Sequence, residues 1–422
     1  MITKMNICGR KRKKTETGDG KREKMQTDFS PSPSVHVNED LIKEILLNLP
    51  TKAVLRFKAL SKSWFSLISD SEFARRHFDA AVSPTHKLLN FVNDSKAYCV
   101  DIKSALCNDS WHAVSNFIVP SSFDLWGSGL SVAGSCRGFL LLQYYFHDLV
   151  MWNPSTGRQK EIHCDSSWPH DLSGMGYDPV DDDIVVVTVT LRINDDNDSK
   201  VSYFSLRTNC WTSVEYVLPY AYSKFQLELR HGQFWNGALY WILKSSDKLR
   251  SVVIAFDVRE KRLSEVPLPN HLAILPLQSD IYHLKVMGEH LFLCLVRNEV
   301  ALIEMWSMKE QHKEVTFWIK TFVFSSYLVG FMSLIFPICF TENGEILAFN
   351  SHDTLLKINK KGNLVRYGKK HSLLDFLSCG MYRESFLSLP GESGEIKWRW
   401  TTKRTQFEWT WRLICSNCYV FI

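Results

Sequence analysis

An apolar residue followed by Asp, Asn or Ser recurs along most of the 422-residue chain at intervals of 52, 52, 52, 50 and 52 residues. The six occurrences are Val100-Asp101, Trp152-Asn153, Phe204-Ser205, Phe256-Asp257, Trp306-Ser307 and Ile358-Asn359. A fixed period of this length in strand-rich sequence is typical of radially arranged four-stranded sheets, because each repeat must bury its faces against its neighbours. Division of residues 86–390 by a period of 52 predicts a β-propeller of about six blades.

Other features of the same region support strands. Phe, Trp and Tyr make up 13% of the chain, which favours a mainly β protein. Short apolar runs led by glycine precede four of the six dipeptides by 14 to 19 residues, as second strands of hairpins would. These glycines are Gly138, Gly237, Gly288 and Gly344. We expect the ring to close by pairing 88–92 with 385–389.

The last 32 residues, 391–422, do not follow the period. They carry Trp398, Trp400, Trp409 and Trp411 in two W-x-W pairs, and each pair would lie on one face of a strand. An added aromatic hairpin and a poorly ordered tail both fit this atypical, Trp-rich segment, and the sequence leaves its structure open.

The charge of the chain is concentrated at its beginning. Residues 1–34 contain nine basic and four acidic side chains, so they account for the whole net charge of +5 and leave 41 of each sign elsewhere. We expect a disordered basic tail, in which the run Arg10–Lys14 is either a nuclear-import signal or polyanion contact, or simply a solvated segment. The balanced remainder has no excess charge to attract phosphate over distance, which argues against specific nucleic-acid binding.

From Val37 the pattern becomes helical. Asn38 can accept hydrogen bonds from free backbone amides at a helix start, and Pro50 ends the helix. One arc of this helix holds Leu41, Ile42, Ile45, Leu46 and Leu49. A second segment, 51–59, contains Val54, Leu55 and Phe57, and a third contains Trp64, Phe65, Leu67 and Ile68. Three helices in about 42 residues are near the lower limit for independent folding, so their many apolar groups predict a partner surface.

Residues 37–78 resemble the F-box, and the following region resembles plant F-box proteins with a kelch-like F-box-associated domain. The second resemblance rests on CRGFLLL at 136–142, LVMWNPSTGRQKEI at 149–162, GMGYDP at 174–179 and NGALYWI at 236–242. The resemblance covers residues 37 to about 390. It implies a three-helix F-box over 35–80 and a propeller over 86–390.

In that family the F-box docks on a Skp-type adaptor, and the adaptor links it to a cullin-RING ubiquitin ligase. The second domain binds the protein to be ubiquitinated and degraded. The resemblance therefore implies adaptor contact by the apolar F-box residues, with Trp64 shared between the adaptor and the core. They are Leu41, Ile45, Leu46, Leu49, Pro50, Val54, Leu55, Leu60 and Trp64. The substrate and its contact residues are not readable from the sequence.

We find no sequence motif for catalysis, a cofactor or a metal. Residues 391–394 lack the spacing of a nucleophile elbow, residues 362–369 lack that of a phosphate loop, and no HExxH occurs. The acidic runs 181–183 and 195–198 lack EF-hand spacing and are interpreted as solvated hairpin tips. Cys415 and Cys418 form a CxxC with no second pair to complete a zinc site.

An uncharged stretch, 321–341, is long enough to span a bilayer. Ser325, Gly330 and Pro337 interrupt it, so we expect two buried strands joined by a short turn and no membrane span. Eleven cysteines, an odd number, and no signal peptide point to a reducing compartment, the nucleus and/or cytoplasm.

The prediction from the sequence is a non-catalytic substrate receptor of a ubiquitin ligase. Two alternatives stay open: an enzyme whose polar groups converge from separate blades, and a nuclear nucleic-acid-associated protein acting through the basic tail.

Overall fold

The computed structural model describes residues 38–80, 86–93, 96–101, 115–118, 130–144, 148–164, 171–191, 198–217, 220–221, 230–245, 250–273, 281–297, 300–311, 315–328, 335–350, 354–367, 379–389, 399–405, 408–415 and 418–421. The chain divides into two compact units, residues 1–44 and 45–422. The predicted basic tail, 1–34, lies outside the described residues.

Four helices begin the described chain. They are α1 (Glu39–Leu47), α2 (Thr51–Phe57), α3 (Lys62–Ser69) and α4 (Ser71–Ala80). As predicted, Asn38 begins α1: its side-chain oxygen accepts a hydrogen bond of 3.0 Å from the Asp40 amide. Pro50, which was expected to end the first helix, precedes α2 as its N-cap residue.

The fourth helix corrects the expectation of three. Asp70 accepts a hydrogen bond of 2.8 Å from the Phe73 amide and so begins α4 immediately after α3. The helix buries Phe73, Ala74 and His77. The sequence gives little sign of this buried face, because only two of the ten positions of the helix are large and apolar.

Seven antiparallel sheets follow in the described residues, and six of them form the blades of a propeller, five with four strands and one with five. Their strands are β25 (Cys379–Arg383), β1 (His86–Asn93), β2 (Lys96–Asp101) and β3 (Ser115–Ile118) in blade one; β4 (Leu130–Cys136), β5 (Phe139–Tyr144), β6 (Asp148–Trp152) and β7 (Gln159–Ile162) in blade two; β8 (Leu172–Asp178), β9 (Asp183–Thr190), β10 (Asp198–Ser205) and β11 (Cys210–Val217) in blade three; β12 (Tyr220–Ala221), β13 (Gln233–Trp235), β14 (Ala238–Ser245), β15 (Ser251–Asp257) and β16 (Arg262–Val266) in blade four; β17 (Ile281–Met287), β18 (His290–Arg297), β19 (Leu302–Gln311) and β20 (Val315–Ser325) in blade five; and β21 (Ile335–Phe340), β22 (Ile346–Asn350), β23 (Leu355–Ile358) and β24 (Leu364–Tyr367) in blade six. A short helix, α6 (Asn270–Ala273), follows β16.

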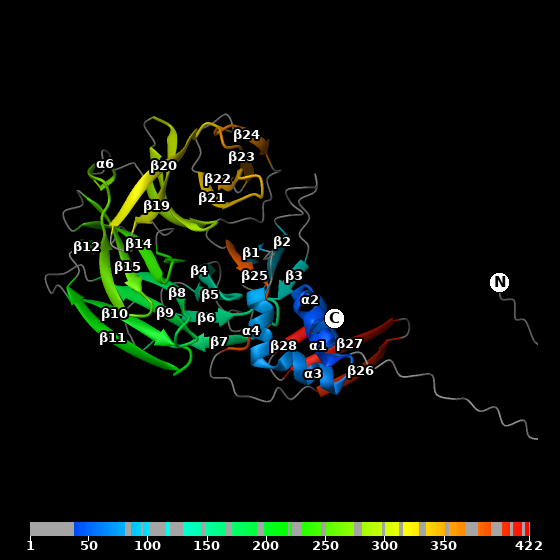
Figure 1. The fold of residues 1–422 in the computed structure, drawn as a ribbon. Coiled ribbons are helices and arrows are strands. Elements are labelled where there is room, and N and C mark those ends of the chain that lie inside the picture. Colours follow the sequence, from blue (N-terminus) through cyan, green and yellow to red (C-terminus); the bar gives the residue numbers. More distant parts are fainter. Residues whose placement is uncertain are drawn as a thin grey trace, which may run out of the picture. The chain divides into compact units, whose positions relative to one another are not determined.

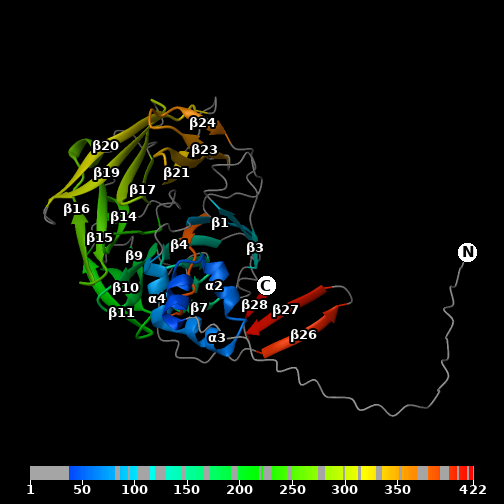
Figure 2. The same ribbon diagram turned by 45° about the vertical axis from the view of Figure 1, so that its right-hand side comes forward.

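The sheets follow one another in chain order around a ring, from cyan through green and yellow to orange (Figures 1 and 2). Buried apolar clusters join blade one to two, three to four, four to five, five to six and six to one. Blades two and three meet where the Ser173 hydroxyl donates a hydrogen bond of 2.6 Å to Gln143. This arrangement confirms a mainly β propeller after a small α unit.

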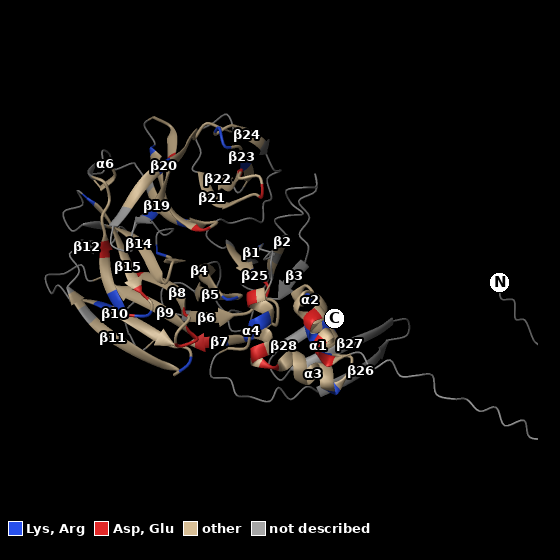
Figure 3. Cartoon of the chain, in the orientation of Figure 1, with Lys and Arg blue, Asp and Glu red and all other residues tan. Residues whose placement is uncertain are grey.

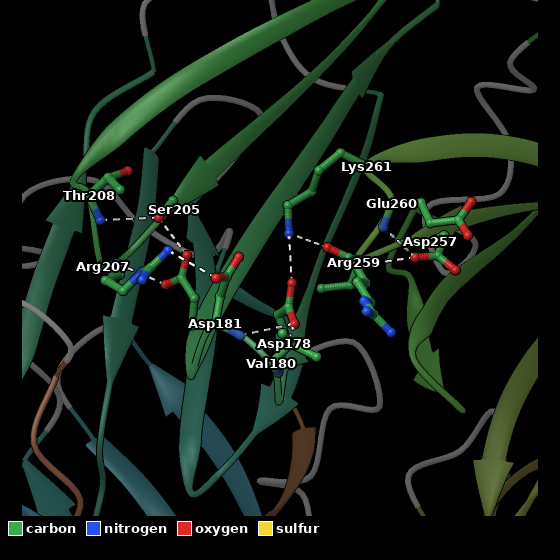
Figure 4. Close-up of polar contacts among 12 residues, drawn as sticks. Asp178, Val180, Asp181, Ser205, Arg207, Thr208, Asp257, Arg259, Glu260 and Lys261 are labelled. Atoms are coloured by element: carbon green, nitrogen blue, oxygen red, sulfur yellow. Dashed lines mark hydrogen bonds and ion pairs between the residues drawn. The ribbon is translucent and has the colours of Figure 1, made fainter.

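The apolar residue of every repeated dipeptide lies in the third strand of its blade, and in five of the six blades the dipeptide marks the end of that strand. The polar residue then caps the turn to the fourth strand, as Asp257 does by accepting hydrogen bonds of 2.9 and 2.7 Å from the Arg259 and Glu260 amides (Figure 4). Ser205 likewise accepts a hydrogen bond of 3.1 Å from the Thr208 amide. In blades two, three, four and six the period therefore marks a buried apolar residue followed by a capped turn, whereas in blade five Trp306-Ser307 lies within β19.

Turns between first and second strands are short. In blade four, Asn236 and Gly237 both have positive φ, 46° and 83°, as a two-residue hairpin of matching twist requires. We call the end of the propeller that carries the first-to-second and third-to-fourth strand turns the turn end.

The ring closes one strand earlier than predicted. Residues 88–92 do pair in β1, but their partner is β25, with Leu88 opposite Met381 and Asn90 opposite Cys379. The predicted partner, 385–389, belongs to no strand and lies outside the sheet. Both segments are apolar, but 385–389 is buried by contacts other than strand pairing.

Two further expectations concern the C-terminal half. The uncharged stretch contributes the end of β20 and all of β21, and no described helix is long and apolar enough to cross a membrane. Its strands are confirmed, although Val323 of β20 is 42% exposed rather than buried. In the atypical tail, β26 (Arg399–Thr405), β27 (Glu408–Cys415) and β28 (Cys418–Phe421) form an antiparallel sheet, so a strand structure rather than an irregular tail follows the propeller.

A glycine in blade three tests the close packing between blades. A Cβ added at Gly176 would lie 2.6 Å from the Phe234 ring and 2.8 Å from Val258. We expect Gly176→Ala to lower the free energy of unfolding by about 2 kcal/mol through overpacking. Gly237→Ala is the control: its Cβ would meet nothing within 4 Å, so only its positive φ should cost about 1 kcal/mol. Equal losses in urea unfolding would contradict the packing argument.

Candidate interaction surfaces

Helix α1 leaves apolar side chains in solvent. Leu41 and Ile45, four residues apart and therefore on one helix face, are each 58% exposed. The next residues, Leu46 and Leu47, are buried instead. One face of the helix thus stabilises the chain itself, and another remains available to a partner.

The segment after α2 presents a third such group. Leu60 is 64% exposed, and Pro50 at the start of α2 is exposed too. Isolated apolar residues on a surface are ordinary, but three large ones within 20 residues of a small helical unit indicate an interface.

The nine residues assigned to adaptor contact fall into three groups. Leu41, Ile45, Pro50 and Leu60 are exposed; Leu49, Leu55 and Trp64 are partly buried; Leu46 and Val54 are buried. The ring of Trp64 lies 5.3 Å from that of Phe57, so it already packs within the helices. Adaptor contact remains a prediction for all nine, and the burial of Leu46 and Val54 shows that these two also support the helices.

The acidic run Asp181–Asp183 lies at the β8–β9 turn, as predicted for a hairpin tip. It is not wholly solvated, however, because Asp183 is only 4% exposed and accepts hydrogen bonds from the Ser205 hydroxyl and the Arg207 amide. Asp178 lies 3.3 Å from the Lys261 ammonium group of the next blade, and Asp181 lies 3.2 Å from Arg207 (Figure 4). These carboxylates stabilise turns through hydrogen bonds and ion pairs with neighbouring side chains and amides. Their positions are explained by these contacts. Asp195 and Asp196 lie outside the described residues.

Metal and nucleophile chemistry finds little support in the described part of the chain. There, no three or more His, Cys, Asp or Glu side chains gather as a metal site would require. Burial raises the pKa of the Cys136 thiol to about 12 and that of Cys339 to about 11, so both thiols stay protonated and weakly nucleophilic at neutral pH. Cys415 and Cys418 are paired in the register of β27 with β28.

Charge is spread evenly over the described elements. Lys and Arg segments and Asp and Glu segments are both scattered among mostly uncharged helices and strands (Figure 3). This distribution agrees with the balanced charge of residues 35–422, and it offers no continuous basic stripe for nucleic acid.

Two family models match the chain. Residues 36–76 match the F-box domain, and residues 88–373, more than half of the chain, match the F-box associated beta propeller domain. The chain belongs to this family. The match confirms the resemblance seen in the sequence and assigns the exposed α1 and Leu60 side chains to the F-box part of this F-box protein.

Its relatives include three proteins of Arabidopsis thaliana. F-box protein CPR1 is 28% identical over 313 residues, 67% of this chain and 71% of that protein. A putative F-box protein is 29% identical over 239 residues, 55% of this chain and 60% of that protein. An F-box/kelch-repeat protein is 27% identical over 245 residues, 54% of this chain and 65% of that protein. The last two matches thus span less than two thirds of those relatives.

Two residues for which the sequence predicted no contact with the helices lie just after the ring closes. Glu384 and Phe386 are buried although they belong to no strand or helix. Their only sequence signal is an apolar run, Phe386-Leu387, next to a charged residue, and such a run is compatible with a strand as well.

Proposed function

We propose that this F-box protein is the non-catalytic substrate receptor of an SCF-type (Skp–cullin–F-box) E3 ubiquitin ligase. Its F-box would bind a Skp-type adaptor and, through it, a cullin-RING ligase, while its propeller would bind a protein substrate for ubiquitination and degradation. The observation that carries the proposal is the pairing of an F-box with an F-box-associated propeller in one chain.

The exposed apolar groups support the adaptor half of the proposal. Ile45 and Leu60 are 58% and 64% exposed, and their burial in an adaptor groove would remove that surface from water. Burial of one such side chain stabilises a complex by about 1.5–3 kcal/mol.

Their replacement by aspartate tests the proposal. We expect Ile45→Asp with Leu60→Asp to weaken binding of a purified Skp-type adaptor at least 100-fold in isothermal titration, because two charges would have to be buried. The control is Val365→Asp, which changes a 51% exposed valine of blade six and should leave adaptor binding unchanged. An unchanged affinity for the double variant would refute the assigned contact surface.

The location of the protein also remains a proposal. The basic run Arg10–Lys14 supports entry into the nucleus, and the odd number of cysteines supports the nucleus and/or cytoplasm over an oxidising compartment. Substitution of all five basic residues by serine should deplete a fluorescently tagged chain from nuclei if the run acts as an import signal.

A further inference from the structure

The residues that follow β25, the strand that closes the ring, are also part of the packed structure. Residues 384–389, here called the strap, follow the last propeller strand and belong to no helix or strand. Residues Glu384, Phe386 and Leu389 are 8%, 5% and 2% exposed. A segment without regular structure is buried to this extent only when other parts of the molecule cover it.

Blade two holds the strap on one side. The Asn153 amide donates hydrogen bonds of 3.2 and 3.5 Å to the carbonyls of Ser385 and Leu387, and the Ser385 amide donates one of 3.2 Å to the Ser155 hydroxyl. The Ser385 hydroxyl donates a further bond of 3.2 Å to the Arg137 carbonyl. These partners belong to the two turns of blade two at the turn end.

Helices α2 and α4 hold the strap on the other side. The Phe386 ring lies 4.7 Å from the His77 ring and 6.2 Å from the Phe73 ring, both on α4. The Thr51 hydroxyl at the start of α2 donates a hydrogen bond of 3.4 Å to the Glu384 carbonyl. The strap thus lies between helices and propeller and contacts both.

A buried ion cluster joins the same three parts. The Glu384 carboxylate lies 2.7 Å from the Lys87 ammonium group of β1 and 3.9 Å from that of Lys52 on α2. The side chains of Glu384 and Lys87 are only 7% and 8% exposed, so removal of either partner would leave the other group buried without its ion pair. Directional contacts between buried charges fix an orientation more strongly than apolar packing does, since they tolerate little sliding.

The end of α4 is held beside the strap. The Arg383 guanidinium lies 4.0 Å from the Phe78 ring centre and donates to the Phe78 carbonyl. Arg137, in the first turn of blade two, lies 3.4 Å from Asp79. These non-covalent contacts attach the helices to the turn end of the propeller, in addition to the chain connection between α4 and β1.

We propose that the strap is a positioning element, which fixes helices α2–α4 on the propeller so that a bound substrate is presented to the ligase in one orientation. The role in substrate presentation rests on the proposed function. The attachment of the helices by the strap does not, because its contacts lie within this chain. Glu384 and Phe386 are the positioning residues.

The test compares three variants in the full chain bound to a Skp-type adaptor. Phe386→Ala removes the apolar contact, and Glu384→Met with Lys87→Met removes the ion pair without leaving a buried charge. Glu345→Gln is the matched control, because Glu345 also pairs with a lysine, Lys357 at 2.5 Å, but in blade six. Tryptophan fluorescence on heating verifies that the propeller of each variant is folded.

Two measurements follow. Hydrogen exchange should quicken at least tenfold in α2–α4 and in residues 384–389 of both strap variants but not in the control. In a reconstituted ligase, ubiquitin should attach to a small set of lysines of the wild-type chain. In the strap variants it should attach to additional lysines of the chain. The affinity of these variants for the adaptor should change less than twofold.

The outcomes separate the two claims. Unchanged exchange in both strap variants overturns the attachment, and faster exchange with an unchanged set of modified lysines overturns the positioning role. If the wild-type chain receives no ubiquitin at all, the proposed function is refuted, and the exchange data still decide whether the strap holds the helices.

Discussion

Replacement of Asn153 by alanine is expected to lower the free energy of unfolding by about 3–4 kcal/mol. Asn153 is fully buried, and its side-chain oxygen accepts hydrogen bonds of 2.9 and 3.3 Å from the Ser155 and Thr156 amides. Its amide group also donates to the Ser385 and Leu387 carbonyls. Alanine would remove this donor from the buried Ser385 and Leu387 carbonyls and the side-chain cap from the partly buried turn amides, and an unsatisfied buried group costs about 1–3 kcal/mol.

Asn359→Ala provides the matched comparison. Asn359 occupies the same repeat position in blade six and accepts hydrogen bonds of 2.9 and 3.0 Å from the Lys361 and Asn363 amides, but it is partly exposed. Loss of this turn cap alone should cost about 1 kcal/mol. Urea unfolding measures both, and equal losses would mean that the bonds from Asn153 to the strap add no stability.

Acidification should destabilise the propeller by roughly 3–5 kcal/mol through His283. The His283 side chain is 6% exposed, and in the described structure neither of its ring nitrogens has a hydrogen-bond partner. Burial, with a smaller effect of Lys285, lowers the pKa of His283 to about 3 from 6.5. Burial also lowers the pKa of His231 to about 4, with smaller effects of Arg230 and Lys285, but this partly exposed residue should contribute less.

The direction follows from proton binding. The folded protein keeps both imidazoles neutral, so below pH 6.5 the unfolded chain binds more protons than the folded one. The stability is therefore complete above pH 6.5 and is lost as the pH falls towards 3–4. Urea midpoints from pH 7 to 4 measure the loss, and His283→Phe should remove more than half of it. His163→Gln, at a histidine whose side chain is 84% exposed, is the control, and an unchanged loss in His283→Phe would contradict the account.

The propeller could be predicted from the sequence because its repeat has a local cause. In blades two, three, four and six a buried apolar residue lies at the end of the third strand and a side-chain oxygen caps the following turn, so residues such as Phe256 and Asp257 recur at one spacing. Glycine at the hairpin turns, as at Gly237, is also a local requirement of backbone conformation.

Contacts between distant segments could not be predicted in this way. The strap follows the last strand with Phe386, Leu387 and Leu389, and an apolar run of that length is equally consistent with a strand and with irregular chain buried by its neighbours. Helix α4 was missed for a related reason, since its buried face includes His77, which forms a 2.8 Å contact with the Leu49 carbonyl. Polar residues buried by tertiary partners carry no apolar signal.

The candidate surface was predicted in part. The family resemblance identified the F-box residues, but periodicity alone does not separate Ile45, which is 58% exposed, from Leu46, which is 1% exposed, because both lie on the same broad arc of α1. The division depends on where α2–α4 pack, which is a tertiary property. The exposed members are therefore the informative positions for mutation.

The central claim is that this chain joins a ligase adaptor to a substrate-binding propeller. Size-exclusion chromatography with light scattering of an equimolar mixture with a purified Skp-type adaptor tests its first requirement most directly. The account predicts a single species whose mass is the sum of one copy of each protein. Two separate peaks at the masses of the free proteins, with the chain folded by circular dichroism, would contradict it.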